Sequence, residues 1–206
     1  MLPRLLSRLI RNIRPSPEPS LTRLNLGELR IWREQYPDVP KPETKLSIQL
    51  IAARWACHDL HGEEMPSIAA GLLEAGLDSP ALIRLAGETQ VSCSADVEGL
   101  VGRVIREFCL PYPFTENQAQ LILSRQIARE VIAGDRDPWR AANYLEKVLW
   151  GRRPANPDLE TLFDLNDELE WDTEYKRYVP VTTADLLDTF ARLGKLSDAQ
   201  IFTDES

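Results

Sequence analysis

Apolar residues recur at intervals of three and four along most of this chain, which is the spacing of one face of an α-helix. Residues 2–13 follow it with leucine and isoleucine, and arginines occupy the opposite face. No segment alternates with the period of two typical of a strand, although residues 176–181 are compatible with a short extended stretch. The pattern predicts an all-α fold: a compact multi-helix bundle or orthogonal array of about eight to ten helices.

Turn and capping residues divide the periodic stretches into separate helices. Thr115 with Gln118 has the pattern of a capping box, and Asp137 and Asn156 each precede a proline suited to the first turn of a helix. Gly76 follows a periodic stretch, as a left-handed glycine does at a helix C-terminus. These signals predict helices over residues 2–13, 21–35, 46–60, 66–75, 81–86, 94–108, 116–133 and 138–150, with two more starting after 156 and 182.

The chain has 206 residues, enough for one domain with a sizeable core. Residues 1–14 form a basic amphipathic helix in this interpretation, and the prolines of residues 15–19 form a hinge because proline breaks helices. Residues 20–206 are expected to be a single helical domain. The first helix could pack on this domain, exchange with a second copy in a homo-oligomer, bind a partner, or lie on a membrane. Membrane attachment is the least favoured, because this helix has four cations and no Trp or Phe.

Charge is unevenly distributed along the chain. The net charge of −8 argues against nucleic-acid binding, which requires a concentrated basic surface. Residues 1–34 contain seven Arg against three Glu, a net charge of +4, whereas residues 156–206 contain thirteen acids against four bases, a net charge of −9. An acidic C-terminal third could receive a basic protein partner, or could simply be solvated.

The acidic stretch in residues 158–174 is the main candidate for a partner-binding site. Its interleaved leucines predict an amphipathic helix with a charged outer face, which is also the simplest structural explanation for the acids. Paired-carboxylate or divalent-metal chemistry is a further possibility, but the stretch lacks the glycine and the alternation of a calcium loop. The candidate partner-binding residues, including two tryptophans that lie beside charges, are Trp32, Asp164, Asp167, Glu168, Glu170, Trp171, Asp172 and Glu174.

The only two histidines of the chain lie close together and are the candidate metal ligands. His58 and His61, three residues apart, would occupy neighbouring positions on one helix face, and Cys57, Glu63 and Glu64 could add ligands. The spacing matches no familiar zinc signature. The alternative is a polar helix terminus, where the helix dipole favours histidine.

Motifs of catalysis are missing from the sequence. We find no Gly-x-Ser-x-Gly elbow, phosphate-binding glycine loop or Cys-x-x-Cys pair, so we predict no catalytic residue and no cofactor. Cys57, Cys93 and Cys109 are too few and too scattered for a disulfide framework, and each is expected to be a buried small hydrophobe. Without a membrane span or a convincing secretory signal, the chain is expected to be cytoplasmic.

Two stretches resemble segments that recur in small uncharacterised bacterial proteins. One is IAAGLLEAGLDSPALIRLAGE, from Ile68 to Glu88, and the other is IAREVIAGDRDPWRAANYLEKVLWG, from Ile127 to Gly151, followed by LETLFDLNDELEWD up to Asp172. The resemblance implies a helical bacterial protein and transfers no active site. The acidic C-terminal third and the missing catalytic motifs together favour a noncatalytic binding protein, immunity- or antitoxin-like, as the leading hypothesis. The alternative is a metal-assisted hydrolase using His58 and His61.

Overall fold

The computed structural model describes residues 32–44, 47–110, 113–175 and 183–203, with side chains omitted for residues 168–175. Every element assigned within these ranges is helical, which confirms the predicted all-α class. Residues 32–35 are helical as well. The remaining helices, in chain order, are α2 (Ile48–Ala56), the 3₁₀ helix η2 (Gly62–Glu64), α3 (Met65–Glu74), α4 (Pro80–Ala86), α5 (Ser94–Glu107), α6 (Glu116–Ala133), α7 (Pro138–Val148), α8 (Pro157–Tyr175), α9 (Thr183–Gly194) and α10 (Asp198–Ile201).

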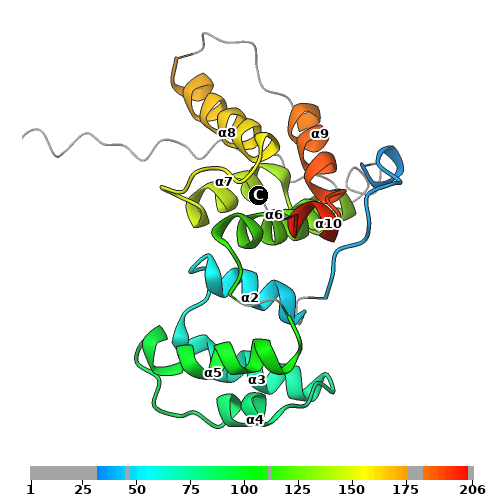
Figure 1. Cartoon of the computed structure of the whole chain (residues 1–206). Helices are drawn as coiled ribbons and strands as arrows, with labels where there is room; N and C mark the ends of the chain where they lie inside the picture. Colours follow the sequence, from blue (N-terminus) through cyan, green and yellow to red (C-terminus); the bar gives the residue numbers. More distant parts are fainter. Residues whose placement is uncertain (1–31, 45–46, 111–112, 176–182, 204–206) are drawn as a thin grey trace, which may run out of the picture.

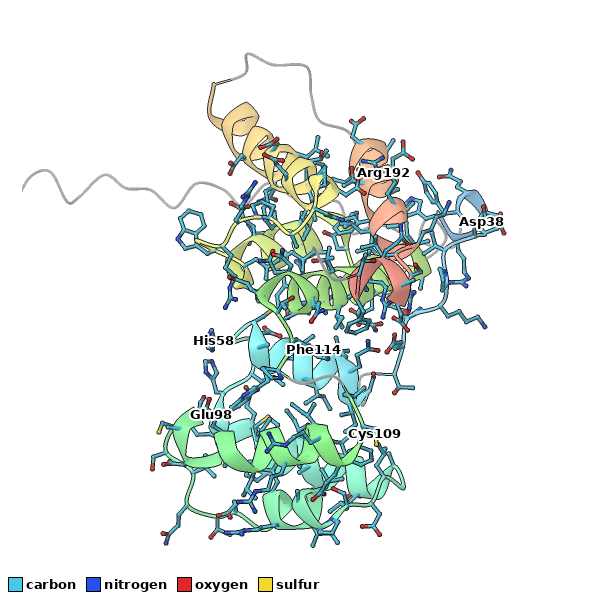
Figure 2. All side chains as sticks on the ribbon, in the orientation of Figure 1. Asp38, His58, Glu98, Cys109, Phe114 and Arg192 are labelled. Atoms are coloured by element: carbon cyan, nitrogen blue, oxygen red, sulfur yellow. The ribbon has the colours of Figure 1, made fainter. Side chains whose placement is uncertain are left out.

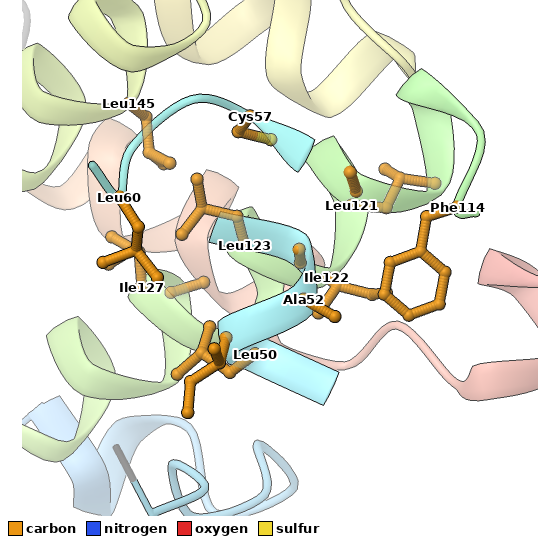
Figure 3. Packing of buried hydrophobic residues seen from close by; sticks show 14 of the residues in the cluster. Leu50, Ala52, Cys57, Leu60, Phe114, Leu121, Ile122, Leu123, Ile127 and Leu145 are labelled. Atoms are coloured by element: carbon orange, nitrogen blue, oxygen red, sulfur yellow. The ribbon is translucent and has the colours of Figure 1, made fainter. Parts of the chain in front are cut away.

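The helices form two groups with α2 between them (Figure 1). Helices α3, α4 and α5 pack together on one side of α2, and α6 to α10 lie on the other side. Helix α2 contacts both α5 and α6, so the two groups share it. The buried apolar side chains form one connected cluster that runs through both groups. Figure 3 shows part of this cluster, with Leu50 and Ala52 of α2 facing Leu123 and Ile127 of α6.

Helix α6 is the central element of the larger group, since α2, α7, α9 and α10 all pack against it. It begins with the predicted capping box, in which the Gln118 backbone N–H donates to Thr115 Oγ1 over 3.2 Å and the Thr115 N–H donates to Gln118 Oε1 over 3.0 Å. It ends at Gly134, whose φ of +83° is the left-handed conformation that glycine adopts without a steric penalty.

Helix α6 also buries polar side chains that a single apolar stripe does not predict. The buried polar residues of this helix are Gln120, Ser124, Arg125, Gln126 and Glu130. Arg125 reaches Asp198 at 2.6 Å and Glu43 at 3.5 Å, and Arg129 reaches Glu43 at 3.6 Å. These acids lie before α2 and in α10, so chain segments from both ends cover the polar side of α6. Pairing offsets the cost of burying the charges.

Several predicted boundaries are correct and others need correction. The starts of α4, α7 and α8, and the end of α3 before a left-handed Gly76, agree with the sequence prediction. The helix predicted over 46–60 is shorter and stops at Ala56. The cap of α5 is Cys93, so Ser94 is the first residue of the helix and not its cap. Helix α10 was not predicted, although Ser197 and Gln200 form a capping box at its start.

Some predictions concern residues outside the described ranges. These are the amphipathic helix of residues 1–14, the hinge at 15–19, most of the helix at 21–35, the extended stretch at 176–181 and the start signal at Thr182. The division into a first helix, a hinge and one domain over 20–206 therefore stays a prediction. Within the described ranges, we find no helix that is both long and apolar enough to cross a membrane.

Candidate functional site: an acidic face on helix α8

Helix α8 carries the predicted acidic stretch and is anchored at its N-terminal half. The Leu159 backbone N–H donates to Asn156 Oδ1 over 2.9 Å, so Asn156 caps the helix. Leu159 and Leu162 are fully buried, and Asn166 is buried and donates to Glu146 of α7. At the start of the helix, Asp158 forms an ion pair of 2.6 Å with Arg192 of α9. These contacts fix which side of α8 faces solvent.

Three acids project from the exposed side of α8, and we call Glu160, Asp164 and Asp167 the acidic face. Their spacing of four and three residues places them on one side of the helix. None of the three has an ion-pair partner among the described residues. The acidic face is therefore a stripe of negative charge, without ion pairs to any described residue, on a helix that is packed through Leu159 and Leu162.

The other predicted partner-binding residues are placed only in part. Glu168, Glu170, Trp171, Asp172 and Glu174 belong to α8, but their side chains lie outside the described set. Their roles stay predictions.

Trp32 is buried. Its side chain is 8% exposed and belongs to the buried apolar cluster. The turn that follows it is held by a hydrogen bond from the Tyr36 hydroxyl to Asp188 of α9. In this conformation Trp32 presents little surface to a partner, and its main contribution is to packing.

The two histidines do not share a helix face, which corrects the sequence prediction. Helix α2 ends before them, and His58 has a left-handed backbone with φ of +58°. His61 precedes η2, where its backbone N–H donates to Glu64 Oε2 over 2.8 Å. Both rings are exposed, and Figure 2 shows His58 at the surface beside the end of α2.

The surroundings of the histidines offer little to a metal ion. Among the described residues there is no group of three or more His, Cys, Asp or Glu side chains placed to hold one. Cys57 is 2% exposed, and burial raises the pKa of its thiol to about 11, so it remains protonated near neutral pH. Glu64 already accepts the hydrogen bond from His61 N–H. The described residues around His58 and His61 therefore provide no set of metal ligands for the hydrolase hypothesis.

The prediction that Cys93 and Cys109 are buried is wrong, because both residues are exposed. Cys93 is the cap of α5, and Cys109 follows α5 with a left-handed φ of +57° (Figure 2). Both positions are set by helix ends, which lie at the surface, and not by an apolar stripe.

A half-buried hydrogen-bonded group near the end of α2 was not predicted. Asp59 Oδ2 accepts from Arg54 Nε and from the Tyr144 hydroxyl, each over 2.6 Å. Burial and the bond to Asp59 raise the pKa of Tyr144 above its ordinary value, so the phenol is a proton donor and not a base at neutral pH. The group joins α2 to α7. No periodicity links Asp59 with Tyr144, which lie 85 positions apart, so this group could not be predicted from the sequence.

No protein-family model matches this chain, and no curated protein or solved structure matches it at a significant level. Function is therefore inferred from the described residues.

Proposed function

We propose that this protein is a noncatalytic protein-binding module, immunity- or antitoxin-like, whose acidic face on α8 contacts a basic partner. The observation that supports the proposal is the exposure of Glu160, Asp164 and Asp167 on one side of a helix, without ion pairs to described residues. Complementary charge accelerates encounter and orients docking. The net charge of −8 adds a long-range attraction for a cationic protein.

The packing of α8 favours a preorganised surface. Leu159 and Leu162 are fully buried beneath the acidic face, and Asp158 is paired with Arg192 of α9. A helix held in this way loses little conformational freedom when a partner binds, which preserves more of the contact energy as affinity. The acidic face is thus better suited to rigid docking than an acidic tail would be.

The test compares two triple charge reversals in the full chain. The first variant is Glu160→Lys, Asp164→Lys, Asp167→Lys. The matched control is Glu74→Lys, Asp78→Lys, Glu98→Lys, which reverses three exposed acids in the group formed by α3, α4 and α5. Both variants change the net charge equally, so they differ only in where the charge lies (Glu98 is labelled in Figure 2).

Affinity capture from extract of the native organism at low salt should recover a basic protein with the wild-type chain and the control. The acidic-face variant should bind that protein roughly tenfold or more weakly, since three exposed charge contacts contribute about 0.2–1 kcal/mol each. Equal binding by the wild type and the acidic-face variant would refute the proposal. Equal weakening by both variants would also refute it, because net charge rather than α8 would then be responsible.

A further inference from the structure

A cavity of about 520 Å³ lies where α6, α8 and α10 begin, well within the size range of small-molecule sites. None of the lining residues that the structure describes is ionisable, and four of these ten are Asn or Gln. The lining residues are Thr115, Asn117, Gln118, Leu121, Ala155, Asn156, Leu196, Gln200, Ile201 and Thr203. Figure 3 shows Leu121 beside Phe114 at the start of α6.

Three of the lining carboxamides are oriented by the helix caps that they form. Gln118 Oε1 accepts from Thr115 N–H over 3.0 Å, and Gln200 Oε1 accepts from Ser197 N–H over 2.9 Å. Asn156 Oδ1 accepts from Leu159 N–H over 2.9 Å. Because each oxygen is engaged by a backbone donor, each NH₂ group remains a donor, and none has a partner among the described residues. The cavity wall therefore offers hydrogen-bond donors.

The caps at the cavity are uncharged, whereas caps elsewhere use carboxylates or hydroxyls. Glu64, Asp96 and Asp137 accept from backbone N–H groups at the starts of η2, α5 and α7. Ser47 and Ser79 accept through their hydroxyls at the starts of α2 and α4. The carboxamides therefore cap their helices while keeping NH₂ donors at the cavity and adding no negative charge there.

The first acids of the three helices are also neutralised. Glu116 pairs with Arg152 at 3.1 Å, and Asp158 pairs with Arg192 at 2.6 Å. Asp198 pairs with Arg125, also at 2.6 Å. The acid nearest each of these helix N-termini is thus paired, and in the first turn of α8 Glu160 is the acid without a described partner.

We propose that this cavity binds a small carboxylate with an apolar body. The NH₂ groups of Gln118, Asn156 and Gln200 would donate to the carboxylate, and the helix N-termini of α6 and α8 favour its charge. The apolar body would contact the leucine and isoleucine side chains of the wall, which are Leu121, Leu196 and Ile201. This site is separate from the acidic face of α8 and does not depend on its proposed role.

The cap geometry supplies variants that remove the donors without removing the caps. Gln118→Glu, Asn156→Asp and Gln200→Glu keep the accepting oxygen of each cap and replace the NH₂ donor by a negative charge. All three variants should fold, with melting temperatures equal to the wild type or slightly higher. Gln90→Glu is the matched control, since Gln90 is exposed and does not line the cavity.

The probe is benzoate, titrated at constant ionic strength into the full, isotope-labelled chain and followed by NMR of the side-chain NH₂ groups. We expect saturable shifts at Gln118, Asn156 and Gln200 with a Kd of roughly 1 mM, as befits a ligand of nine non-hydrogen atoms. The Gln118→Glu and Gln200→Glu variants should bind at least about tenfold more weakly, and the control should bind as the wild type does.

Three results would overturn the proposal. One is the absence of a saturable shift at the three carboxamides. Another is unchanged benzoate affinity in the folded Gln118→Glu and Gln200→Glu variants. The third is equal affinity for benzamide, the uncharged analogue, because the cavity would then not select a carboxylate.

Discussion

The carboxamide of Gln126 pairs with both backbone groups of Glu43. Glu43 N–H donates to Gln126 Oε1 over 2.8 Å, and Gln126 Nε2 donates to the Glu43 carbonyl over 3.0 Å. A neighbouring β-strand would form hydrogen bonds with the backbone N–H and C=O groups of an extended segment in the same way. Here a side chain of the central helix α6 does so, and it thereby ties the segment before α2 to the core.

Replacement of Gln126 by Leu should lower the free energy of unfolding by about 1–3 kcal/mol, because both Glu43 backbone groups lose their partner in a half-buried place. Urea unfolding followed by circular dichroism measures this change. Gln90→Leu removes an exposed amide and should stay within about 0.5 kcal/mol of the wild type. Equal stability of the two variants would show that the pairing contributes nothing.

Gly62 is required by close approach and not by its backbone angles. A Cβ at this position would lie 2.5 Å from the Cys93 carbonyl oxygen and 2.7 Å from Ser94 Cα, both of them backbone atoms that cannot yield locally. Gly62→Ala should therefore lower the free energy of unfolding by roughly 1–3 kcal/mol.

Substitution of Gly99, in the same helix group, should change the free energy of unfolding in the opposite direction. It lies inside α5, and nothing is within 4 Å of a Cβ built there. Gly99→Ala should raise the free energy of unfolding by about 0.5–1 kcal/mol, since alanine favours a helix interior. Thermal melts of both alanine variants test the pair, and a stable Gly62→Ala protein would show that α5 can move away from residue 62.

The three cysteines should differ in reactivity. Cys93 and Cys109 are exposed, whereas Cys57 is buried and its pKa is raised to about 11. Brief treatment with iodoacetamide near neutral pH should label two thiols per folded chain and three after denaturation, as counted by mass spectrometry. The Cys57→Ala variant should give two in both states. Rapid native labelling of Cys57 would contradict the packing of α2 against its neighbours.

Alkaline pH should destabilise the fold through two tyrosines. Burial and the hydrogen bond to Asp188 raise the pKa of Tyr36 to about 12, and burial with the bond to Asp59 raises that of Tyr144. In the unfolded chain a tyrosine loses its proton near pH 10. The folded state therefore holds more protons above that pH, and the stability present below pH 10 is lost as pH rises through the folded values.

The free energy of unfolding measured between pH 8 and 12 should fall less steeply in the Tyr36→Phe, Tyr144→Phe variant than in the wild type. This comparison separates the tyrosines from lysines, which titrate in the same range and are unchanged in the variant. Parallel curves for the two proteins would show that neither phenol is protected by the fold.

Much of the fold could be predicted from local pattern, and much of the candidate site could not. The Thr115–Gln118 capping box, the Asp137 cap and the left-handed Gly76 lie where the sequence indicates, because each depends on residues within about one turn. A charged outer side of the helix over 158–174 was likewise predicted, with Asp164 and Asp167 among its acids, whereas Glu160 was not named. The prediction that His58 and His61 share a helix face failed, because α2 ends at Ala56 and His58 has a left-handed backbone.

The sequence by itself determined the helical class, most helix starts and the acidic character of α8, since these depend on propensity, capping and spacing along the chain. Only the tertiary structure decided which polar groups are buried. The contact of Gln126 with Glu43, the bond from Tyr144 to Asp59 and the cavity beside Gln200 each join residues far apart in sequence. Such groupings arise when helices pack, and no periodicity of the chain encodes which distant side chains then meet.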